Sequence, residues 1–421
     1  MSKIIIQNGN MCELDLPLKF AQKLYNEFAI RHPNAFYLRT RQRGMQNWDG
    51  KIHYITKTGQ FKIGLLPKVY DMCIEMGIKP KVVDMRQPLP KVSKVVTNIG
   101  KYKLRPEQEK AVKAVINNKI GNTPFHIGVL DYTVNAGKTL IMSSLYLSYK
   151  KQLKTLLITN DSDWLNQARE EFKQYLPGED ITFVQGKVLN WSNFTIGMVQ
   201  SISRNMRFYQ KELSQIDMVL IDEADQGGSK QYQNVITRLF NTRIRIGLSG
   251  TIYMSKLAKD RVKNMNLECF FGKVIAEFKL KDSIKKGYST KTVVKMVPGK
   301  PWYGNWESDC ISYKEIYDDS ITNCYTAWLM AYNRLLWNLN QGRYPALVVC
   351  KHIAHCENLY KFFKKKLGDA YNIAYVHVNT PSKLRQQIMK DFREGKIDIL
   401  VSTTIIARGK NFPKLRYLLN A

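Results

Sequence analysis

The feature that most constrains the fold of this chain is the segment 133–139, with the sequence Thr-Val-Asn-Ala-Gly-Lys-Thr. An apolar segment precedes it at 126–130, and apolar residues at helical spacing follow it over 140–147. A strand, a tight turn and a helix in this order predict a phosphate-binding loop. In such a loop the backbone N–H groups and the helix N-terminus hold phosphate, Lys138 reaches the outer phosphates, and the Thr139 hydroxyl faces Mg²⁺.

The match to the strict phosphate-loop pattern is incomplete. Tyr132 stands six positions before Lys138, where the pattern requires Gly, and Asn135 stands where many such loops carry a second Gly. Asn tolerates a positive φ better than most residues, so the turn can still form. Taken alone, the segment also fits an ordinary strand–turn–helix with a lysine at the helix start.

An acidic tetrad about 85 residues further on favours the nucleotide interpretation. The apolar run 218–221 ends in Asp222-Glu223-Ala224-Asp225. A parallel strand that is buried on both faces has such a continuous apolar run, and ligands of α/β folds bind where these strands end. We expect Asp222 to hold Mg²⁺ and Glu223 to orient a water molecule for attack on the γ-phosphate. An acidic helix N-cap is the simpler alternative, but the Gly-Lys-Thr loop in the same pattern favours a nucleotide hydrolase.

The region 98–277 alternates strand and helix patterns, which predicts a parallel, doubly wound α/β sheet. Its expected strands are 126–130, 156–159, 196–199, 218–221 and 244–248. Pro106 opens a helix before the first strand, and Asp161-Ser162 can cap another.

Size and charge bound the class of protein. At 421 residues, two or three domains are expected. The net charge of +30 is spread along the chain, and such a basic globular protein points to a polyanionic partner, most simply nucleic acid. Solubility alone rarely calls for so large an excess.

The seven cysteines include no Cys-x-x-Cys pair, which is typical of a reduced, intracellular protein, and we expect a cytoplasmic location. Cys350, His352, His355 and Cys356 lie close enough in sequence to leave a zinc site open as a minor alternative. No signal peptide and no apolar run of membrane-spanning length is visible, so no membrane partner is expected.

Residues 1–97 predict a small α+β unit. We expect an amphipathic helix over 17–31, an Arg-rich strand from Phe36, a hairpin turn at Asp49-Gly50, and a linker over 80–100. Basic side chains interleaved with aromatic rings fit a DNA-contacting surface. A solvated hairpin with its aromatic rings in the core is the alternative.

Several of these segments occur in an order along the chain that resembles the superfamily-two helicases. The matching segments are Gln108, Gly137-Lys138-Thr139, Gln200-Ser201, Asp222-Glu223-Ala224-Asp225 and Ser249-Gly250-Thr251. Beyond residue 277, the segment Lys285–Tyr288 is similar to the family's entry into its second domain, and 401–413 is similar to its fifth motif, with Asn411 where an Asp is common. The N-terminal unit, with Asn47-Trp48-Asp49-Gly50-Lys51, looks like that of the phage UvsW-type recombination helicases.

This resemblance implies an architecture and an activity. Two RecA-like doubly wound parallel-sheet lobes, 98–277 and 278–421, would follow the N-terminal DNA-binding domain 1–97, with ATP between the lobes. The chain would be a monomeric ATP-driven DNA helicase that unwinds forked or branched DNA and migrates junctions in phage recombination, repair or replication, in the host-cell cytoplasm if it is phage-encoded.

The resemblance also implies residue roles. Catalysis would rest on Lys138, Asp222 and Glu223, with Mg²⁺ held by Thr139 and Asp222. ATP would be bound by Arg105, Gln108, Asn135, Ala136, Gly137, Lys138, Thr139 and Gly409. DNA would be contacted by Arg39, Arg41, Arg43, Trp48, Lys51, Gln200, Ser201, Thr403 and Thr404, and Asp225, Ser249 and Thr251 would couple the two sites.

Two points stay open in the sequence. No Gln-x-x-Gly-Arg-x-x-Arg follows Pro413, so the sixth motif of the family, with its arginine finger, is missing; we expect a truncated product that binds ATP and DNA but hydrolyses ATP poorly. The alternatives are an RNA helicase, suggested by the Asp-Glu-Ala-Asp tetrad, a translocating subunit of a restriction or remodelling complex, and a DNA-binding protein with a degenerate motor.

Overall fold

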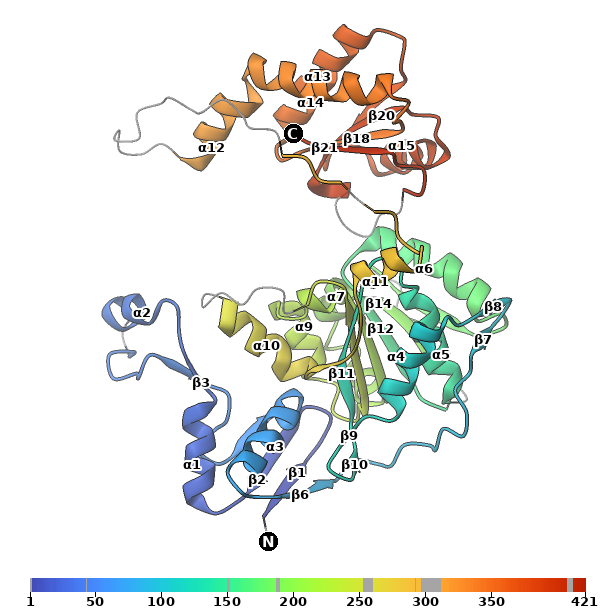
Figure 1. The fold of residues 1–421 in the computed structure, drawn as a ribbon. Coiled ribbons are helices and arrows are strands. Elements are labelled where there is room, and N and C mark those ends of the chain that lie inside the picture. Colours follow the sequence, from blue (N-terminus) through green and yellow to red (C-terminus); the bar gives the residue numbers. More distant parts are fainter. Residues whose placement is uncertain are drawn as a thin grey trace. The chain divides into compact units, whose positions relative to one another are not determined.

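The computed structural model describes residues 2–42, 44–149, 152–186, 190–252, 260–291, 293–296, 312–406 and 412–421. The chain divides into two compact units, Met1–Thr292 and Val293–Ala421 (Figure 1). Within the first unit we call residues 2–84 the N-terminal module and residues 98–291 lobe 1. The predicted domain boundaries after residues 97 and 277 stay predictions.

Lobe 1 is built on a seven-stranded sheet in which every pair of neighbours is parallel. The spatial order is β13-β14-β12-β15-β16-β11-β17. The strands are β11 (His126–Tyr132), β12 (Thr155–Thr159), β13 (Ile181–Val184), β14 (Phe194–Met198), β15 (Met218–Asp222), β16 (Ile244–Ser249) and β17 (Val274–Phe278). The five inner strands are fully buried, which explains their continuous apolar runs. The predicted doubly wound α/β fold is confirmed.

Helices cover both faces of this sheet (Figure 1). One face packs against α4 (Pro106–Ile116), α5 (Lys138–Ser148) and α6 (Ser162–Tyr175). The other packs against α7 (Val199–Arg204), α8 (Gln210–Ser214), α9 (Lys230–Ile236) and α10 (Arg261–Phe271). The short helix α11 (Leu280–Lys285) follows β17, and the small strand pairs are β7 (Asn98–Ile99) with β8 (Tyr102–Lys103) and β9 (Lys119–Ile120) with β10 (Thr123–Pro124).

The body of the N-terminal module, outside residues 29–53, is a four-stranded sheet with two α-helices, which confirms the expected α+β class. Its strand order is β5-β2-β1-β6, with β1 (Lys3–Ile6), β2 (Met11–Asp15), β5 (Gln60–Lys62) and β6 (Lys81–Asp84), and its helices are α1 (Leu18–Glu27) and α3 (Leu66–Glu75). The predicted linker over 80–100 is wrong at its start, because β6 pairs in parallel with β1. The predicted helix over 17–31 is too long, because 29–31 forms a strand.

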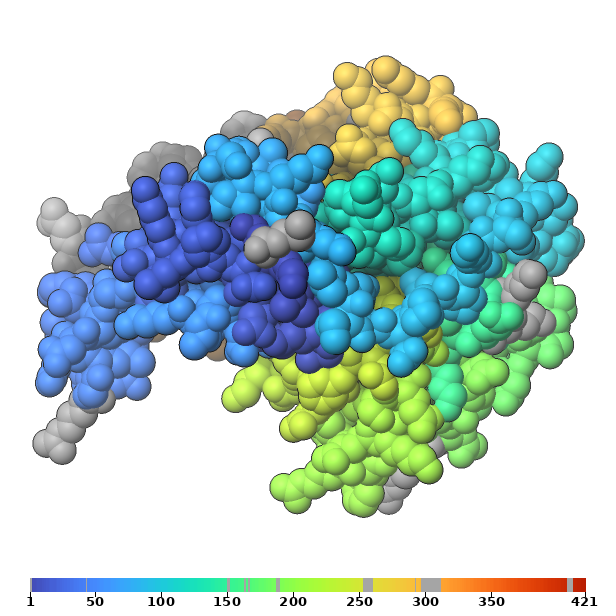
Figure 2. Space-filling view, turned by 90° about the horizontal axis from the view of Figure 1, so that it is seen from below, coloured from blue at the N-terminus to red at the C-terminus, as the bar shows by residue number. Residues whose placement is uncertain are grey.

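The N-terminal module and lobe 1 share one hydrophobic core. Buried residues of the module, such as Ile4 and Phe61, belong to the same cluster as Ile127 and Val219 of the lobe 1 sheet. The space-filling view of Figure 2 shows the module (dark to light blue) lying directly against lobe 1. The fully buried Arg245 of β16 strengthens this contact, because its Nη2 donates to Gly9 O at 2.6 Å and to Asn10 Oδ1 at 2.7 Å.

An arm, residues 29–53, leaves the module and returns to it (Figure 1). Strand β3 (Ala29–Arg31) pairs antiparallel with β4 (Lys51–His53), and α2 (Ala35–Arg41) lies between them. The predicted Arg-rich strand is therefore wrong, because these residues have no strand to pair with and close a helical turn instead. The predicted hairpin is also wrong: Gly50 does adopt a positive φ of 78°, but β4 pairs with β3, before the helix.

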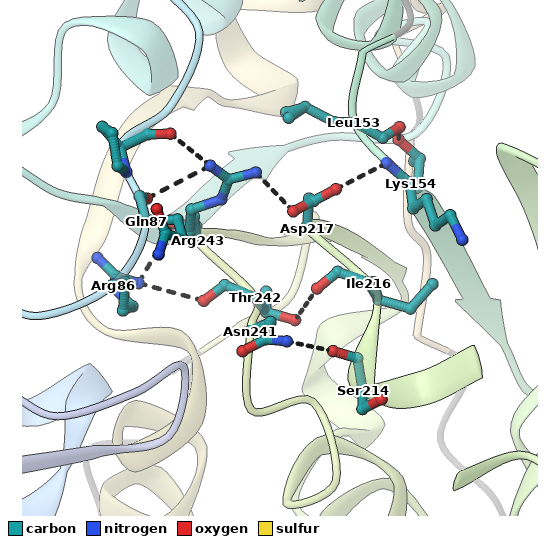
Figure 3. A network of polar contacts seen from close by, with 12 residues as sticks. Arg86, Gln87, Leu153, Lys154, Ser214, Ile216, Asp217, Asn241, Thr242 and Arg243 are labelled. Atoms are coloured by element: carbon teal, nitrogen blue, oxygen red, sulfur yellow. Dashed lines mark hydrogen bonds and ion pairs between the residues drawn. The ribbon is translucent and has the colours of Figure 1, made fainter. Parts of the chain in front are cut away.

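The segment 85–97 connects the module to lobe 1 along the edge where the strands of lobe 1 begin (Figure 3). Arg86 donates to Thr242 O at 3.2 Å, and Arg243 donates to Pro88 O at 2.5 Å. Arg243 also pairs with Asp217 at 2.5 Å, and Asp217 accepts from the Lys154 backbone N–H at 3.0 Å. This polar network fixes the connection on the side of the sheet away from the strand ends that carry the site.

The second unit is a smaller parallel sheet in the order β19-β20-β18-β21. Its strands are β18 (Ala346–Cys350), β19 (Ile373–Val376), β20 (Ile399–Thr403) and β21 (Tyr417–Asn420), and its helices are α12 (Tyr313–Tyr317), α13 (Tyr325–Asn340), α14 (Ile353–Leu367) and α15 (Ser382–Glu394). One core lies between the sheet, α13 and α14, and another beneath α15. Among the described helices of both units, none combines the length and apolarity needed to cross a membrane.

Candidate nucleotide and nucleic-acid site

The segment 133–139 forms a tight turn between β11 and α5. Asn135 and Gly137 both adopt left-handed backbone conformations, with φ values of 64° and 73°. Tyr132 is the last residue of β11, is fully buried, and donates its hydroxyl to Glu107 O at 2.8 Å. The missing Gly of the strict pattern therefore falls in the strand, and the turn itself follows it.

Gln108 of α4 holds this turn from behind. Its Nε2 donates to Ala136 O at 2.9 Å, and its Oε1 accepts from the Arg105 backbone N–H at 2.8 Å. A Cβ on Gly137 would come within 2.3 Å of Gln108 Nε2, and with a φ of 73° any other residue would be strained there and would displace this amide. Gln108 is 1% exposed, and its contacts are with the turn. The structure therefore shows it positioning the phosphate loop, and its predicted contact with adenine stays a prediction.

Lys138 faces the two carboxylates at the end of β15. Its Nζ lies 3.6 Å from Asp222 Oδ1 and 3.9 Å from Glu223 Oε1. Burial raises the pKa of Asp222, and the nearby charge of Lys138 and the Glu223 backbone N–H counter that rise. Glu223 adopts a left-handed backbone, with φ 53°, so its side chain leaves the strand in a different direction from that of Asp222.

This arrangement fits a divalent cation. Asp222 Oδ1 is buried and has no hydrogen-bond partner among the described residues, only the longer ion pair with Lys138. A carboxylate oxygen is the ligand type that Mg²⁺ prefers. Thr139, the first-turn residue predicted to share the ion, follows Lys138 on α5 at the same edge of the sheet.

A cluster beside the phosphate loop joins four residues from α4 and from the segment after β17. The Arg105 guanidinium lies 4.3 Å from the centre of the Tyr288 ring, and its Nη2 donates to Asn135 O at 3.1 Å. Lys286 Nζ lies 2.8 Å from Glu107 Oε2. Sequence reasoning missed Tyr288 and Lys286 as site residues, because no local signal links them to a loop so far away in sequence.

The residues predicted to couple the sites are in contact. Ser249 Oγ donates to Asp225 Oδ1 at 3.3 Å, lies 3.3 Å from Thr251 Oγ1, and accepts from the Thr251 backbone N–H at 3.2 Å. The end of β16 is thereby joined to the segment after β15. Their coupling role stays a prediction.

The residues predicted to contact DNA in the first unit lie in two places. Gln200 and Ser201 begin α7; Gln200 Nε2 donates to Asn160 O at 3.3 Å, and Ser201 Oγ accepts from the Gly186 N–H at 2.9 Å. The others lie on the arm, where Arg39, Arg41 and Lys51 are exposed and Trp48 Nε1 donates to Lys51 O at 2.9 Å. Arg43 lies outside the described residues.

In the second unit, Thr403 ends β20 and is buried, whereas the next residue, Thr404, is exposed. Gly409 lies outside the described residues, as do Arg408 and Asn411 of the predicted fifth motif. The alternative zinc residues make other contacts. Tyr317 Oη and His355 Nδ1 are hydrogen-bonded at 3.1 Å, and Cys350 and Cys356 share a side-chain hydrogen bond, which with burial raises the pKa of Cys350.

Two family models match the chain. The model described as "Type III restriction enzyme, res subunit" matches residues 101–254, and the "Helicase conserved C-terminal domain" model matches residues 329–421. Together these segments cover more than half of the chain, and they span the phosphate loop, the acidic tetrad and the sheet of the second unit.

Curated relatives match over shorter stretches. The ATP-dependent RNA helicase RhlB of Shewanella woodyi is 33% identical over 89 residues, which is 21% of this chain and 20% of that protein. The ATP-dependent RNA helicase CHR1 of Candida albicans is 22% identical over 215 residues, which is 50% of this chain and 31% of that protein. The chain thus spans about a fifth to a third of the length of these relatives.

Solved structures share the fold. The UvsW helicase from Bacteriophage T4 has a TM-score of 0.52 at 20% identity, over 66% of this chain and 99% of that one. A second T4 UvsW structure has a TM-score of 0.51 at 19% identity, over 99% of this chain and 83% of that one. S. cerevisiae Dbp5 bound to RNA and ADP BeF3 has a TM-score of 0.50 at 15% identity, over 76% of this chain and 74% of that one.

Proposed function

Because the chain belongs to the superfamily-two helicases, we propose that it is an ATP-driven motor that translocates on forked or branched DNA and unwinds it. The observation that carries this proposal is the arrangement of Lys138 opposite Asp222 and Glu223 beside a left-handed turn. A purely structural ion pair would not need to leave the buried Asp222 Oδ1 without a hydrogen bond among the described residues.

The residues of lobe 1 have distinct parts in the proposed hydrolysis. The backbone N–H groups of the turn and the start of α5 bind the phosphates, and Lys138 leaves the carboxylates for the outer phosphates. Asp222 and Thr139 would hold Mg²⁺, which would supply positive charge opposite the phosphates. Glu223 accepts a proton from, or orients, the attacking water.

A DNA partner is supported by charge and by the arm. The net charge of +30 provides the non-specific attraction to phosphate, and the arm presents Arg39, Arg41 and Lys51 to solvent. A role in recombination, repair or branch migration is a narrower proposal, supported by the likeness in fold to a phage helicase.

RNA is the second candidate substrate. The observation that favours it is that the curated relatives with local matches carry the name ATP-dependent RNA helicase. Those matches cover about a fifth to a half of this chain. The basic arm, which belongs to the N-terminal module, falls outside the matched family models.

The test is the rate of ATP hydrolysis with single-stranded DNA, forked DNA, four-way DNA and single-stranded RNA of matched length. We expect the greatest stimulation with forked or four-way DNA, and its loss in Lys138→Ala. Lys173→Ala, which removes an exposed lysine from α6, is the matched control. Hydrolysis that survives Lys138→Ala would refute the nucleotide site, and stimulation by RNA alone would refute the DNA substrate.

A further inference from the structure

The outward face of α2 carries two adjacent aromatic residues that are largely exposed to solvent. Phe36 is 79% exposed and Tyr37 is 55% exposed. The helix is held to the arm from its other side, where Ala35 is buried and a Cβ on Gly50 would lie 3.2 Å from the Ala35 Cβ. Figure 1 shows α2 at the far end of the arm.

This exposure is unfavourable unless something covers the rings. Leaving a phenylalanine side chain in water forgoes most of the stabilisation that its burial would supply. Single exposed apolar residues are common, but two neighbouring aromatic residues on a helix with one buried residue form a patch. At helical spacing, Phe36, Tyr37 and Thr40 share one face, and the Thr40 hydroxyl is already bonded to Phe36 O at 3.0 Å.

The surroundings of the rings select a negatively charged partner. Arg39 and Arg41 flank the aromatic face on its two sides, and the Arg41 guanidinium lies 5.0 Å from the centre of the Tyr37 ring. The one acidic residue of the arm, Asp49, is engaged by His53 Nε2 at 2.6 Å. The patch is therefore both aromatic and basic. Nucleic acid strands whose bases are unpaired offer flat apolar rings and phosphates together.

We propose that the Phe36–Tyr37 face of α2 stacks against unpaired bases of DNA, while Arg39 and Arg41 contact the adjoining phosphates. The inference rests on the proposed function and narrows it: the arm would distinguish a fork, which has unpaired bases, from a continuous duplex, which has none. The phosphate contacts alone would bind both equally.

The experiment measures the affinity of the full chain for a fork with unpaired thymine arms and for a blunt duplex of equal nucleotide number, at fixed salt. Stacking contributes enough per base that Phe36→Ala with Tyr37→Ala should weaken fork binding at least about fivefold and leave duplex binding within about twofold. Phe36→Trp should retain fork binding. Phe36→Leu, which keeps apolar area but not the ring, should lose it.

Matched variants separate stacking from charge and from folding. Leu18→Ala removes another exposed apolar residue of the module, 77% exposed on α1, and should change neither affinity. The double variant Arg39→Gln, Arg41→Gln should weaken binding to both the fork and the duplex and should reduce the salt dependence of binding. The aromatic variants should leave the salt dependence unchanged.

Several outcomes would overturn the inference. One is an equal loss of affinity for fork and duplex in the aromatic variants, and another is full fork binding by Phe36→Leu. The others are ring-dependent binding that is tighter for unpaired RNA than for DNA, and a self-association of the chain that Phe36→Ala abolishes. A wild-type chain that binds no DNA would refute the proposed function itself. A wild-type chain that binds forks and hydrolyses ATP, with aromatic variants that behave like it, would refute the stacking alone.

Discussion

The contact between Arg105 and Tyr288 allows a quantitative test of the part of the proposed nucleotide site that would bind the nucleobase. Tyr288→Ala removes the ring that lies 4.3 Å from the Arg105 guanidinium. A cation–π contact contributes about 0.5–1 kcal/mol when exposed and about 2 kcal/mol when desolvated. The Arg105 side chain is 28% exposed, between these limits. We therefore expect about 1 kcal/mol, which is about a fivefold loss of ATP affinity.

The physical reason is the orientation of the guanidinium. Tyr288 covers one face of it, and its Nη2 is fixed on Asn135 O in the phosphate loop at 3.1 Å. We expect a nucleobase to stack on the opposite face of the guanidinium. Without the ring, Arg105 gains rotational freedom and presents that face for less of the time. Tyr288 is a positioning residue in this account, and it acts through Arg105.

The assay is displacement of a fluorescent ADP by ATP and, separately, by inorganic tripolyphosphate, with Mg²⁺ present. Tyr288→Ala should weaken the binding of ATP about fivefold and leave the binding of tripolyphosphate unchanged, because tripolyphosphate has no base. Tyr288→Phe keeps the ring and should match the wild type. In a double-mutant cycle with Arg105→Ala, the two losses should be less than additive. An equal loss for both ligands, or additive losses, would show that Tyr288 serves only the fold.

Three further predictions test other parts of the first unit. Glu223→Gln should reduce DNA-stimulated ATP hydrolysis by about 10²–10⁴-fold while ATP still binds, as measured by steady-state rates beside a binding titration. Gly137→Ala should weaken ATP binding, because the new Cβ would lie 2.3 Å from Gln108 Nε2 and would displace this amide from Ala136 O, whereas Gly178→Ala, which has a similar positive φ but open space, should cost some stability and no ATP affinity. Arg245→Met should lower the free energy of unfolding in urea by about 3 kcal/mol or more, because buried acceptors lose their donor, whereas exposed Arg238→Met should change it by less than about 0.5 kcal/mol.

The sequence located most of lobe 1 because its signals are local. Each inner strand is buried on both faces, so apolar runs such as Met218–Ile221 marked the strands to within one or two residues. The sequence signal for the turn in the phosphate loop was also local, because Asn135 and Gly137 are residue types that tolerate the positive φ that they adopt. The same holds for Asp161, whose Oδ1 accepts from the Trp164 backbone N–H at 3.1 Å as predicted.

The contacts that sequence reasoning missed depend on residues far apart in the chain. Tyr288 meets Arg105 only because β17 lies beside β11 in the sheet, a neighbour relation that no local pattern specifies. The segment from Phe36 was predicted to be an Arg-rich strand, and aromatic residues such as Phe36 and Tyr37 do favour strands. The predicted hairpin would pair this segment with β4, but β4 pairs with β3 in a sheet of two strands. Without a partner strand, the helix satisfies the backbone hydrogen bonds of α2 locally.

The shared core changes what the N-terminal module can do. A separate domain on a linker would sample many orientations, but this module buries Ile4 and Phe61 in the same cluster as the lobe 1 sheet. Tyr54 Oη also donates to Asn266 Oδ1 at 3.0 Å, and Lys68 pairs with Glu268 at 2.5 Å, so the residue that follows β4 and the helix α3 are tied to α10. Helix α10 follows the Ser249–Thr251 segment in sequence. A displacement of lobe 1 should therefore carry the arm with it, and bases held on α2 would move with the lobe that we propose to bind the phosphates.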